Sequence, residues 1–167
     1  MASERHLPFL IIGGHAVNAY GYSRFTNDLD VLIRGTDRAV WIAAPGELGF
    51  MLYQYGGGFL QMTPPAECRW PLALMLVAAA TFEPMLAASR EIEVSERKLR
   101  VPSLEHLFAL KFHALKQEIP GRGYKDLLDV LALADCNAVD LQSDKIRRLC
   151  EKYGSPKIYE RLIAFKG

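Results

Sequence analysis

The sequence predicts an α+β fold in which strands and short helices precede a C-terminal helical lobe. Two observations predict it: strand-like apolar runs lie before residue 102, and helical patterns broken by Pro and Gly fill the rest. With 167 residues, 50% of them hydrophobic, the chain can bury a substantial core. We expect an α/β core over residues 1–102 and a helical lobe over residues 103–167 that packs on it, so that the chain forms a single compact unit.

Short apolar runs bounded by turn residues predict the strands of the first part. We expect strands near residues 9–13 and 27–33, a hairpin or irregular edge strand over 51–62, a buried strand over 72–77, and one or two short strands over 90–101. The segments between them predict helices over residues 15–22, 37–48 and 81–89.

Breaker residues divide the second part into four predicted helices. The breaks are Pro120-Gly121, Asp140 and Gly154-Ser155-Pro156. The helices are expected over residues 104–117, 122–135, 141–153 and 156–165.

Composition excludes several classes of protein. The formal net charge is only +1, so we expect no broad basic surface of the kind that binds nucleic acid non-specifically. Cys68, Cys136 and Cys150 are odd in number and widely spaced, which argues against a disulfide framework or a zinc site. The N-terminus lacks a signal-peptide pattern, and the longest apolar run, Trp70 to Phe82, is too short to span a bilayer. These features predict a cytoplasmic protein that does not use a membrane.

Asp28 and Asp30 predict a metal site. They lie two residues apart in a predicted strand, so their side chains point to the same face. Two carboxylates on one face repel each other unless a cation lies between them. Hard divalent cations such as Mg²⁺ or Mn²⁺ prefer oxygen ligands and commonly keep substrate phosphates as further ligands.

Gly13 and Gly14, between a predicted strand and a predicted helix, supply a second part of such a site. Glycines allow close approach of the backbone, and N–H groups of a following helix can hold a phosphate. Together with the aspartates they predict metal-assisted chemistry on a nucleotide.

The order and spacing of these residues also carry a family resemblance. The chain resembles the nucleotidyltransferase superfamily with the DNA polymerase β-type fold, and within it the small bacterial proteins related to AbiEii-type toxins of toxin–antitoxin systems. The resemblance covers the first third of the chain and, more loosely, residues 104–134. It rests on Gly13-Gly14-His15-Ala16, Gly21, Arg24, Thr26, Asp28 and Asp30.

The resemblance implies a mixed sheet flanked by helices, an activity and a set of site residues. The substrate would be a nucleoside triphosphate with Mg²⁺ or Mn²⁺, and a nucleoside monophosphate would pass to a hydroxyl of an RNA such as tRNA, of a protein or of a small molecule. An antitoxin or regulator is the implied partner. The implied catalytic residues are Asp28, Asp30, Arg24 and Lys111, with the two aspartates as metal ligands. The implied nucleotide contacts are Gly13, Gly14, His15, Thr26, Lys111, Lys125 and Asp126.

Some of these residues have a plainer interpretation. Arg24 either stabilises charge on a transferring phosphoryl group or pairs with Asp28 or Asp30. His15 and Asn18, in the first turns after the glycines, either contact substrate or serve as capping and surface residues.

Lys111 lies inside the apolar stripe of its predicted helix. On a helical wheel it falls about 20° from Leu104 and about 40° from Leu115. Such a lysine either extends past the edge of the core into water or faces a nucleotide cleft, where it holds a triphosphate as the resemblance implies.

Residues 122–129 also allow two interpretations. Arg122 with Asp126, and Lys125 with Asp129, have the i,i+4 spacing of an exposed, salt-bridged helix face. The resemblance instead places the lysine and aspartate of this segment at the border of the active site. In both interpretations the core side of the helix is formed by Tyr124, Leu127, Leu128 and Leu131.

One expected acid is missing. The resemblance implies a third carboxylate on the strand over 72–77, but this strand holds no acid and Ala73 occupies the expected position. Glu67 and Glu83 are the nearest acids in the sequence. The alternative function is therefore a catalytically impaired relative that acts as a binding or regulatory module.

Overall fold

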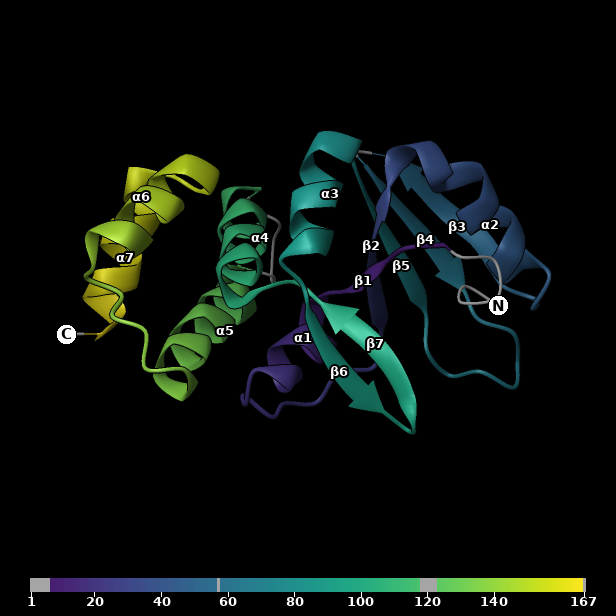
Figure 1. Ribbon diagram of the computed structural model, residues 1–167, viewed down its shortest axis with the longest axis horizontal. Coiled ribbons are helices and arrows are strands. Elements are labelled where there is room, and N and C mark those ends of the chain that lie inside the picture. The colour runs from purple at the N-terminus through teal and green to yellow at the C-terminus, as the bar shows by residue number, and fades with distance from the viewer. Residues whose placement is uncertain (1–6, 57, 118–122, 167) are drawn as a thin grey trace. The chain divides into compact units, whose positions relative to one another are not determined.

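The computed structural model describes residues 7–56, 58–117 and 123–166. The chain divides into two compact units, labelled by element in Figure 1. The first comprises Met1–Ala16 and Arg24–Ser103, and the second comprises Val17–Ser23 and Leu104–Gly167. This grouping differs from a single cut at residue 102, because the short segment 17–23 belongs with the helices of the second unit.

The first unit is built on a mixed sheet of five strands, as the resemblance implies. Its strand order is β1-β2-β5-β4-β3. Only β2 and β5 run parallel, and every other neighbouring pair is antiparallel. A separate hairpin pairs β6 with β7. The strands are β1 (Leu10–Ile11), β2 (Leu29–Arg34), β3 (Met51–Gly56), β4 (Phe59–Thr63), β5 (Leu72–Val77), β6 (Arg90–Val94) and β7 (Arg97–Val101).

The two faces of this sheet differ in burial. In β5, Leu72 and Leu74 are buried whereas Ala73 between them is half-buried. In β4, Leu60 and Met62 are buried whereas Gln61 is half-buried. Alternate side chains of a strand point to opposite faces, so one face forms the core and the other is partly open. The prediction of a buried strand over 72–77 is correct for only one of its two faces.

Three helices belong wholly or partly to the first unit: α1 (Gly13–Ala19), α2 (Arg38–Gly46) and α3 (Ala79–Ala87). A short 3₁₀ turn, η1 (Gly35–Asp37), precedes α2. The buried side chains of these helices include Trp41, Phe82 and Met85. The rings of Trp41 and Phe9 pack edge to face, with their centroids 5.5 Å apart.

The second unit contains the four predicted helices, α4 (Leu104–Lys116), α5 (Gly123–Cys136), α6 (Asp144–Tyr153) and α7 (Pro156–Lys166). Helix α6 begins three residues later than predicted because Asp140 and Ser143 first form a turn. The Asp140 side chain accepts from the backbone N–H of Gln142 at 2.9 Å, and Ser143 then caps the helix. The segment 17–23 is tied to α5 by the Asn137 side-chain amide, which donates to the carbonyl of Tyr20 at 2.9 Å.

The three cysteines are free, as the sequence predicts. Cys150 is fully buried, and burial raises the pKa of its thiol to about 11. This side chain is therefore a packed apolar group rather than a reactive thiol. Within the described ranges, no helix has the length and apolar character needed to cross a membrane.

Candidate functional site

Gly13 and Gly14 turn the chain directly from β1 into α1. Ile12 continues the pairing of β1, since its N–H donates to the carbonyl of Asp30 at 2.9 Å. Gly13 then adopts φ +61°, a left-handed backbone conformation that residues other than glycine rarely adopt. The turn therefore begins beside the strand that carries Asp30.

The space beside each glycine is occupied by predicted site residues. A Cβ on Gly13 would lie 1.9 Å from Oδ2 of Asp30. A Cβ on Gly14 would lie 2.6 Å from Oγ1 of Thr26 and 3.0 Å from an Nη1 of Arg24. Any side chain at either glycine would displace these groups.

Asp28 joins the same cluster through Thr26, whose hydroxyl donates to Oδ1 of Asp28 at 2.7 Å. This bond leaves the second oxygen of the carboxylate as an acceptor for other groups and holds the side chain in one orientation. The structure thus brings six predicted residues together within the first unit. We call this cluster the motif site: Gly13, Gly14, Arg24, Thr26, Asp28 and Asp30.

The sheet register identifies the neighbour of Asp30. Asp30 of β2 is paired with Ala73 of β5, and Ala73 is paired in turn with Gln61 of β4. Paired residues point to the same face, so the position predicted for the missing acid does lie beside Asp30 but holds a methyl group. Gln61 further along the row is neutral, and its Oε1 accepts from the hydroxyl of Tyr53 at 2.7 Å.

Glu83 does not replace the missing acid. Its carboxylate pairs with Arg34 at 2.9 Å, at the opposite end of β2 from Asp28. Strand residues rise about 3.3 Å each, which separates Arg34 from Asp30 by roughly 13 Å. Glu67 is exposed in the segment between β4 and β5. No group of three or more His, Cys, Asp or Glu that could hold a metal occurs in the part of the chain that the structure describes.

The donor set of the motif site fits a divalent cation only in part. Two carboxylates and a hydroxyl are hard oxygen groups of the kind Mg²⁺ or Mn²⁺ binds. A third carboxylate is not supplied by the row of Asp30, Ala73 and Gln61. Such an ion would therefore depend on water and substrate phosphates for its remaining ligands.

Trp70, which is not among the predicted site residues, contacts His15, the residue that follows Gly14. It comes just before β5, and its ring stacks on the ring of His15 with centroids 4.9 Å apart and planes inclined by 29°. His15 directly follows Gly14. The sequence signal was an aromatic residue three positions before Ala73, but its stacking partner is distant in the chain.

Lys111 is buried in the second unit, as its place in the apolar stripe predicts, but it does not extend into water. Its Nζ lies 2.7 Å from Oδ1 of Asp126 and 2.5 Å from Oδ2 of Asp129. The three residues are 7%, 3% and 1% exposed. Helix α5 therefore points two carboxylates at the lysine of α4.

These contacts correct the interpretation of residues 122–129 as an exposed salt-bridged face. Asp126 and Asp129 are buried, whereas Lys125 is exposed, and Arg122 lies outside the described residues. The predicted core side of α5 is also partly wrong, since Tyr124 is 62% exposed and Leu128 and Leu131 are only half-buried. Pairing with Lys111 accounts for the burial of these two aspartates.

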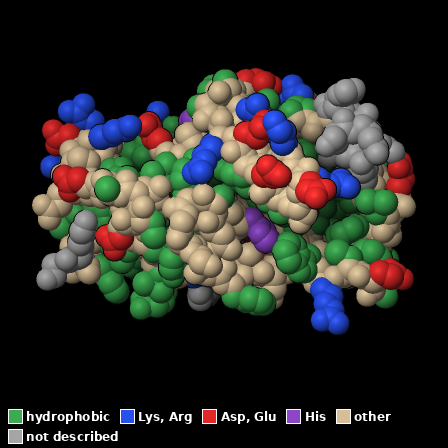
Figure 2. Space-filling model, turned by 60° about the horizontal axis from the view of Figure 1, so that its bottom comes forward, with side chains coloured by type: hydrophobic (Ala, Val, Ile, Leu, Met, Phe, Trp, Pro, Cys, Tyr) green, Lys and Arg blue, Asp and Glu red, His purple; other side chains and the backbone are tan. Residues whose placement is uncertain are grey.

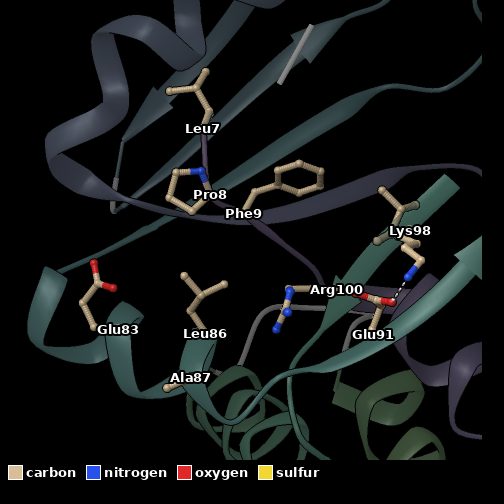
Figure 3. A pocket seen from close by; sticks show the side chains of 10 residues that line it. Leu7, Pro8, Phe9, Glu83, Leu86, Ala87, Glu91, Lys98 and Arg100 are labelled. Carbon is tan, nitrogen blue, oxygen red and sulfur yellow. Dashed lines mark ion pairs between the residues drawn. The ribbon is translucent and has the colours of Figure 1, made fainter. Parts of the chain in front are cut away.

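One cavity in the first unit is separate from the motif site. Its volume is about 570 Å³, and it lies among the segment before β1, helix α3 and the β6–β7 hairpin. Figure 3 shows Leu86 and Phe9 beside it and the ion pair between Lys98 and Glu91, which measures 3.0 Å. None of the six motif-site residues lines this cavity.

Comparison with known proteins agrees with the predicted fold. No family model matches the chain, and no curated protein matches it. Among solved structures, it is similar to ANT(2″)-Ia in complex with adenylyl-2″-tobramycin, with TM-score 0.68, 20% identity, and 91% of this chain and 90% of that chain covered.

Two further structures give the same result. An antigenic nucleotidyltransferase-like protein from Paracoccidioides brasiliensis matches with TM-score 0.55 and 15% identity over 98% of this chain and 87% of that chain. The lincosamide antibiotic adenylyltransferase LnuA, lincomycin-bound, matches with TM-score 0.56 and 12% identity over 83% of this chain and 91% of that chain. The chain thus has the nucleotidyltransferase fold.

Substituting the glycines tests how tightly the motif site is packed. We expect Gly13→Ala to destabilise the protein by about 1–3 kcal/mol, because it combines a left-handed backbone with a clash against Asp30. Gly46→Ala is the matched control, since a Cβ there meets no atom within 4 Å. Equal midpoints of thermal unfolding for the two variants would contradict the packing described.

Lys111→Met tests the buried cluster in the second unit. We expect a loss of about 3–5 kcal/mol in the free energy of unfolding, because two buried carboxylates lose their counter-ion. Lys125→Met, at an exposed position of α5, should change it by less than about 0.5 kcal/mol. Adding Asp126→Asn and Asp129→Asn to Lys111→Met should recover part of the loss in urea unfolding. A triple variant less stable than Lys111→Met would argue against charge as the cause.

Proposed function

We propose that this protein is a metal-dependent nucleotidyltransferase that binds a nucleoside triphosphate and transfers a nucleoside monophosphate to a hydroxyl acceptor. One observation carries the proposal: six residues predicted from a nucleotidyltransferase-like string converge on one cluster within a nucleotidyltransferase fold. Glycine turns and paired aspartates are each common, but their convergence at Gly13–Asp30 is specific.

The proposed roles follow from the chemistry of each group. Asp28 and Asp30 hold Mg²⁺ or Mn²⁺, with Thr26 orienting Asp28. The backbone at Gly13 and Gly14 approaches the phosphates closely, because no side chain intervenes. When bound, the ion neutralises charge on the phosphates and on the leaving pyrophosphate. Arg24, beside Gly14, adds positive charge where the transferring phosphoryl group develops negative charge.

The reaction exchanges one phosphorus–oxygen bond for another. The acceptor oxygen forms a bond to the α-phosphorus, the bond from the α-phosphorus to the bridging oxygen breaks, and pyrophosphate leaves. The acceptor hydroxyl loses its proton in the process. In-line transfer of this kind depends mainly on positioning and electrostatics, which the motif site supplies. A carboxylate base would assist the proton loss, and Ala73 does not provide one.

Lys111 remains a predicted phosphate ligand, with Lys125 and Asp126 as predicted neighbours of the nucleotide. Its ammonium is held by two carboxylates, and the three side chains together carry a net charge of −1. To hold a phosphate, Lys111 would have to exchange a carboxylate partner for it. If it does so, the folded Lys111→Met variant binds triphosphate more weakly; an unchanged affinity would assign the lysine to stability alone.

We propose a small molecule as the acceptor, because the charge pattern does not favour an RNA. Basic and acidic side chains are interspersed on the face shown in Figure 2, and the formal net charge is +1. Non-specific RNA binding draws on a concentration of positive charge that this face does not have. The second candidate is a toxin-like role with an RNA such as tRNA or a protein as acceptor and an antitoxin as partner. It is supported by the Arg24-x-Thr26-x-Asp28-x-Asp30 string.

Nucleotide binding is the first test of the proposal. At about ten times the dissociation constant, a nucleoside triphosphate with Mg²⁺ should raise the midpoint of thermal unfolding by roughly 3–6 °C, because it binds only the folded state. Asp28→Asn with Asp30→Asn should abolish the dependence on metal. Glu93→Gln with Glu96→Gln, which removes two exposed charges from the same unit, is the matched control. No shift of the wild type with any of the four triphosphates at millimolar concentration would refute the proposal.

Ala73→Asp separates an active enzyme from an impaired relative. A carboxylate beside Asp30 would add an oxygen ligand and a base on the same face. We expect the variant to bind Mn²⁺ more tightly than the wild type, measured by electron paramagnetic resonance of the free ion. If the wild type is impaired, the Ala73→Asp variant should also turn over labelled triphosphate faster than the wild type. Ala73→Asn controls for size, and equal metal affinities of the two variants would contradict the assignment of position 73.

A further inference from the structure

Trp70 is partly exposed and stacks on His15, the residue that follows Gly14 of the motif site. Of the two tryptophans, Trp41 is 3% exposed, whereas Trp70 is 47% exposed. One face of the Trp70 ring is covered by the stacked imidazole of His15. Since one ring face is covered by His15 and nearly half of the residue is exposed, the other face is the one that a ligand could stack on.

The position of this ring is fixed by the two elements that form the motif site. His15 follows Gly14, so α1 carries the imidazole next to the glycine turn. On the other side, the N–H of Leu29 donates to the carbonyl of Pro71 at 2.9 Å. This bond continues the parallel pairing of β2 and β5 and brings Trp70 beside the start of β2, which Asp28 directly precedes.

The ring of His15 is held without a hydrogen bond at Nε2. This nitrogen is buried and has no hydrogen-bond partner among the described residues. Contact with Trp70 therefore contributes to the position of the imidazole, and the imidazole in turn supports the indole ring. The two rings therefore form one stacked pair.

We infer that the open face of Trp70 stacks the base of the nucleoside triphosphate. This inference rests on the proposed function, which places the phosphates at the glycine turn and the two aspartates. A single ribose joins the phosphates to the base, so the base must lie near the edge of the phosphate site, where Trp70 is found. Every base has a π-face, so stacking tolerates all four bases.

Fluorescence of Trp70 tests the contact directly. In a Trp41→Phe background, Trp70 is the remaining tryptophan, and ATP with Mg²⁺ should change its emission saturably. Inorganic triphosphate, which lacks a base, should compete with ATP for the protein but leave the emission unchanged. Emission that is unaffected by ATP at concentrations that stabilise the protein would overturn the inference.

Affinity measurements test its energetic contribution. Trp70→Ala should raise the dissociation constant of ATP by about 5- to 100-fold, from the usual effect of removing one stacked ring. The same substitution should leave the dissociation constant of inorganic triphosphate within about twofold of the wild-type value. Trp70→Phe should keep ATP binding close to that of the wild type. Phe165→Ala, which removes a ring that is 54% exposed from α7, is the control and should have no effect.

The outcomes distinguish this inference from the proposed function. If the wild type binds no triphosphate, the proposed function fails. If it binds ATP, and Trp70→Ala binds ATP equally well, the base does not stack on Trp70 while the proposed function stands. If Trp70→Ala and Trp70→Phe weaken ATP and inorganic triphosphate equally, Trp70 only supports the fold of the site, and the inference is wrong.

Discussion

The motif site depends on the absence of side chains at Gly13 and Gly14. A Cβ on either glycine would meet Asp30 or Thr26 at less than 3.0 Å. The two glycines therefore allow Asp30 of β2 and Thr26, in the segment before β2, to pack directly against the turn between β1 and α1. The same space lets the backbone approach a ligand, so one constraint serves both the packing of the cluster and the chemistry proposed for it.

The parallel pairing of β2 and β5 determines what else lies at this site. Its register places Ala73 beside Asp30 and continues through Pro71, which brings Trp70 to the end of β2. A shift of one residue would turn the opposite face of β5 toward Asp30. The apolar residues Leu72 and Leu74 prevent such a shift, because they must remain in the core. Core packing thus fixes which side chains surround the aspartates.

Lys111 illustrates how a correct sequence pattern leaves a role open. The helical wheel predicts that it faces inward, and it is buried. Its partners, Asp126 and Asp129, belong to another helix, where i,i+4 spacing with basic residues favours an exposed face. Burial of a lysine requires counter-ions, and this requirement outweighs the local pairing. Local charge patterns therefore gave the wrong face for the two aspartates.

The sequence alone determined the features that depend on neighbours in the chain. Strand, glycine turn, helix and aspartate strand follow one another within residues 9–33, and the four later helices are bounded by Pro, Gly and Asp. Only the tertiary structure decided that Trp70 stacks on His15 and that Lys111 binds Asp126 and Asp129. The physical reason is that sheet register and helix packing minimise exposed apolar area over the whole unit, so they select partners that no local spacing specifies.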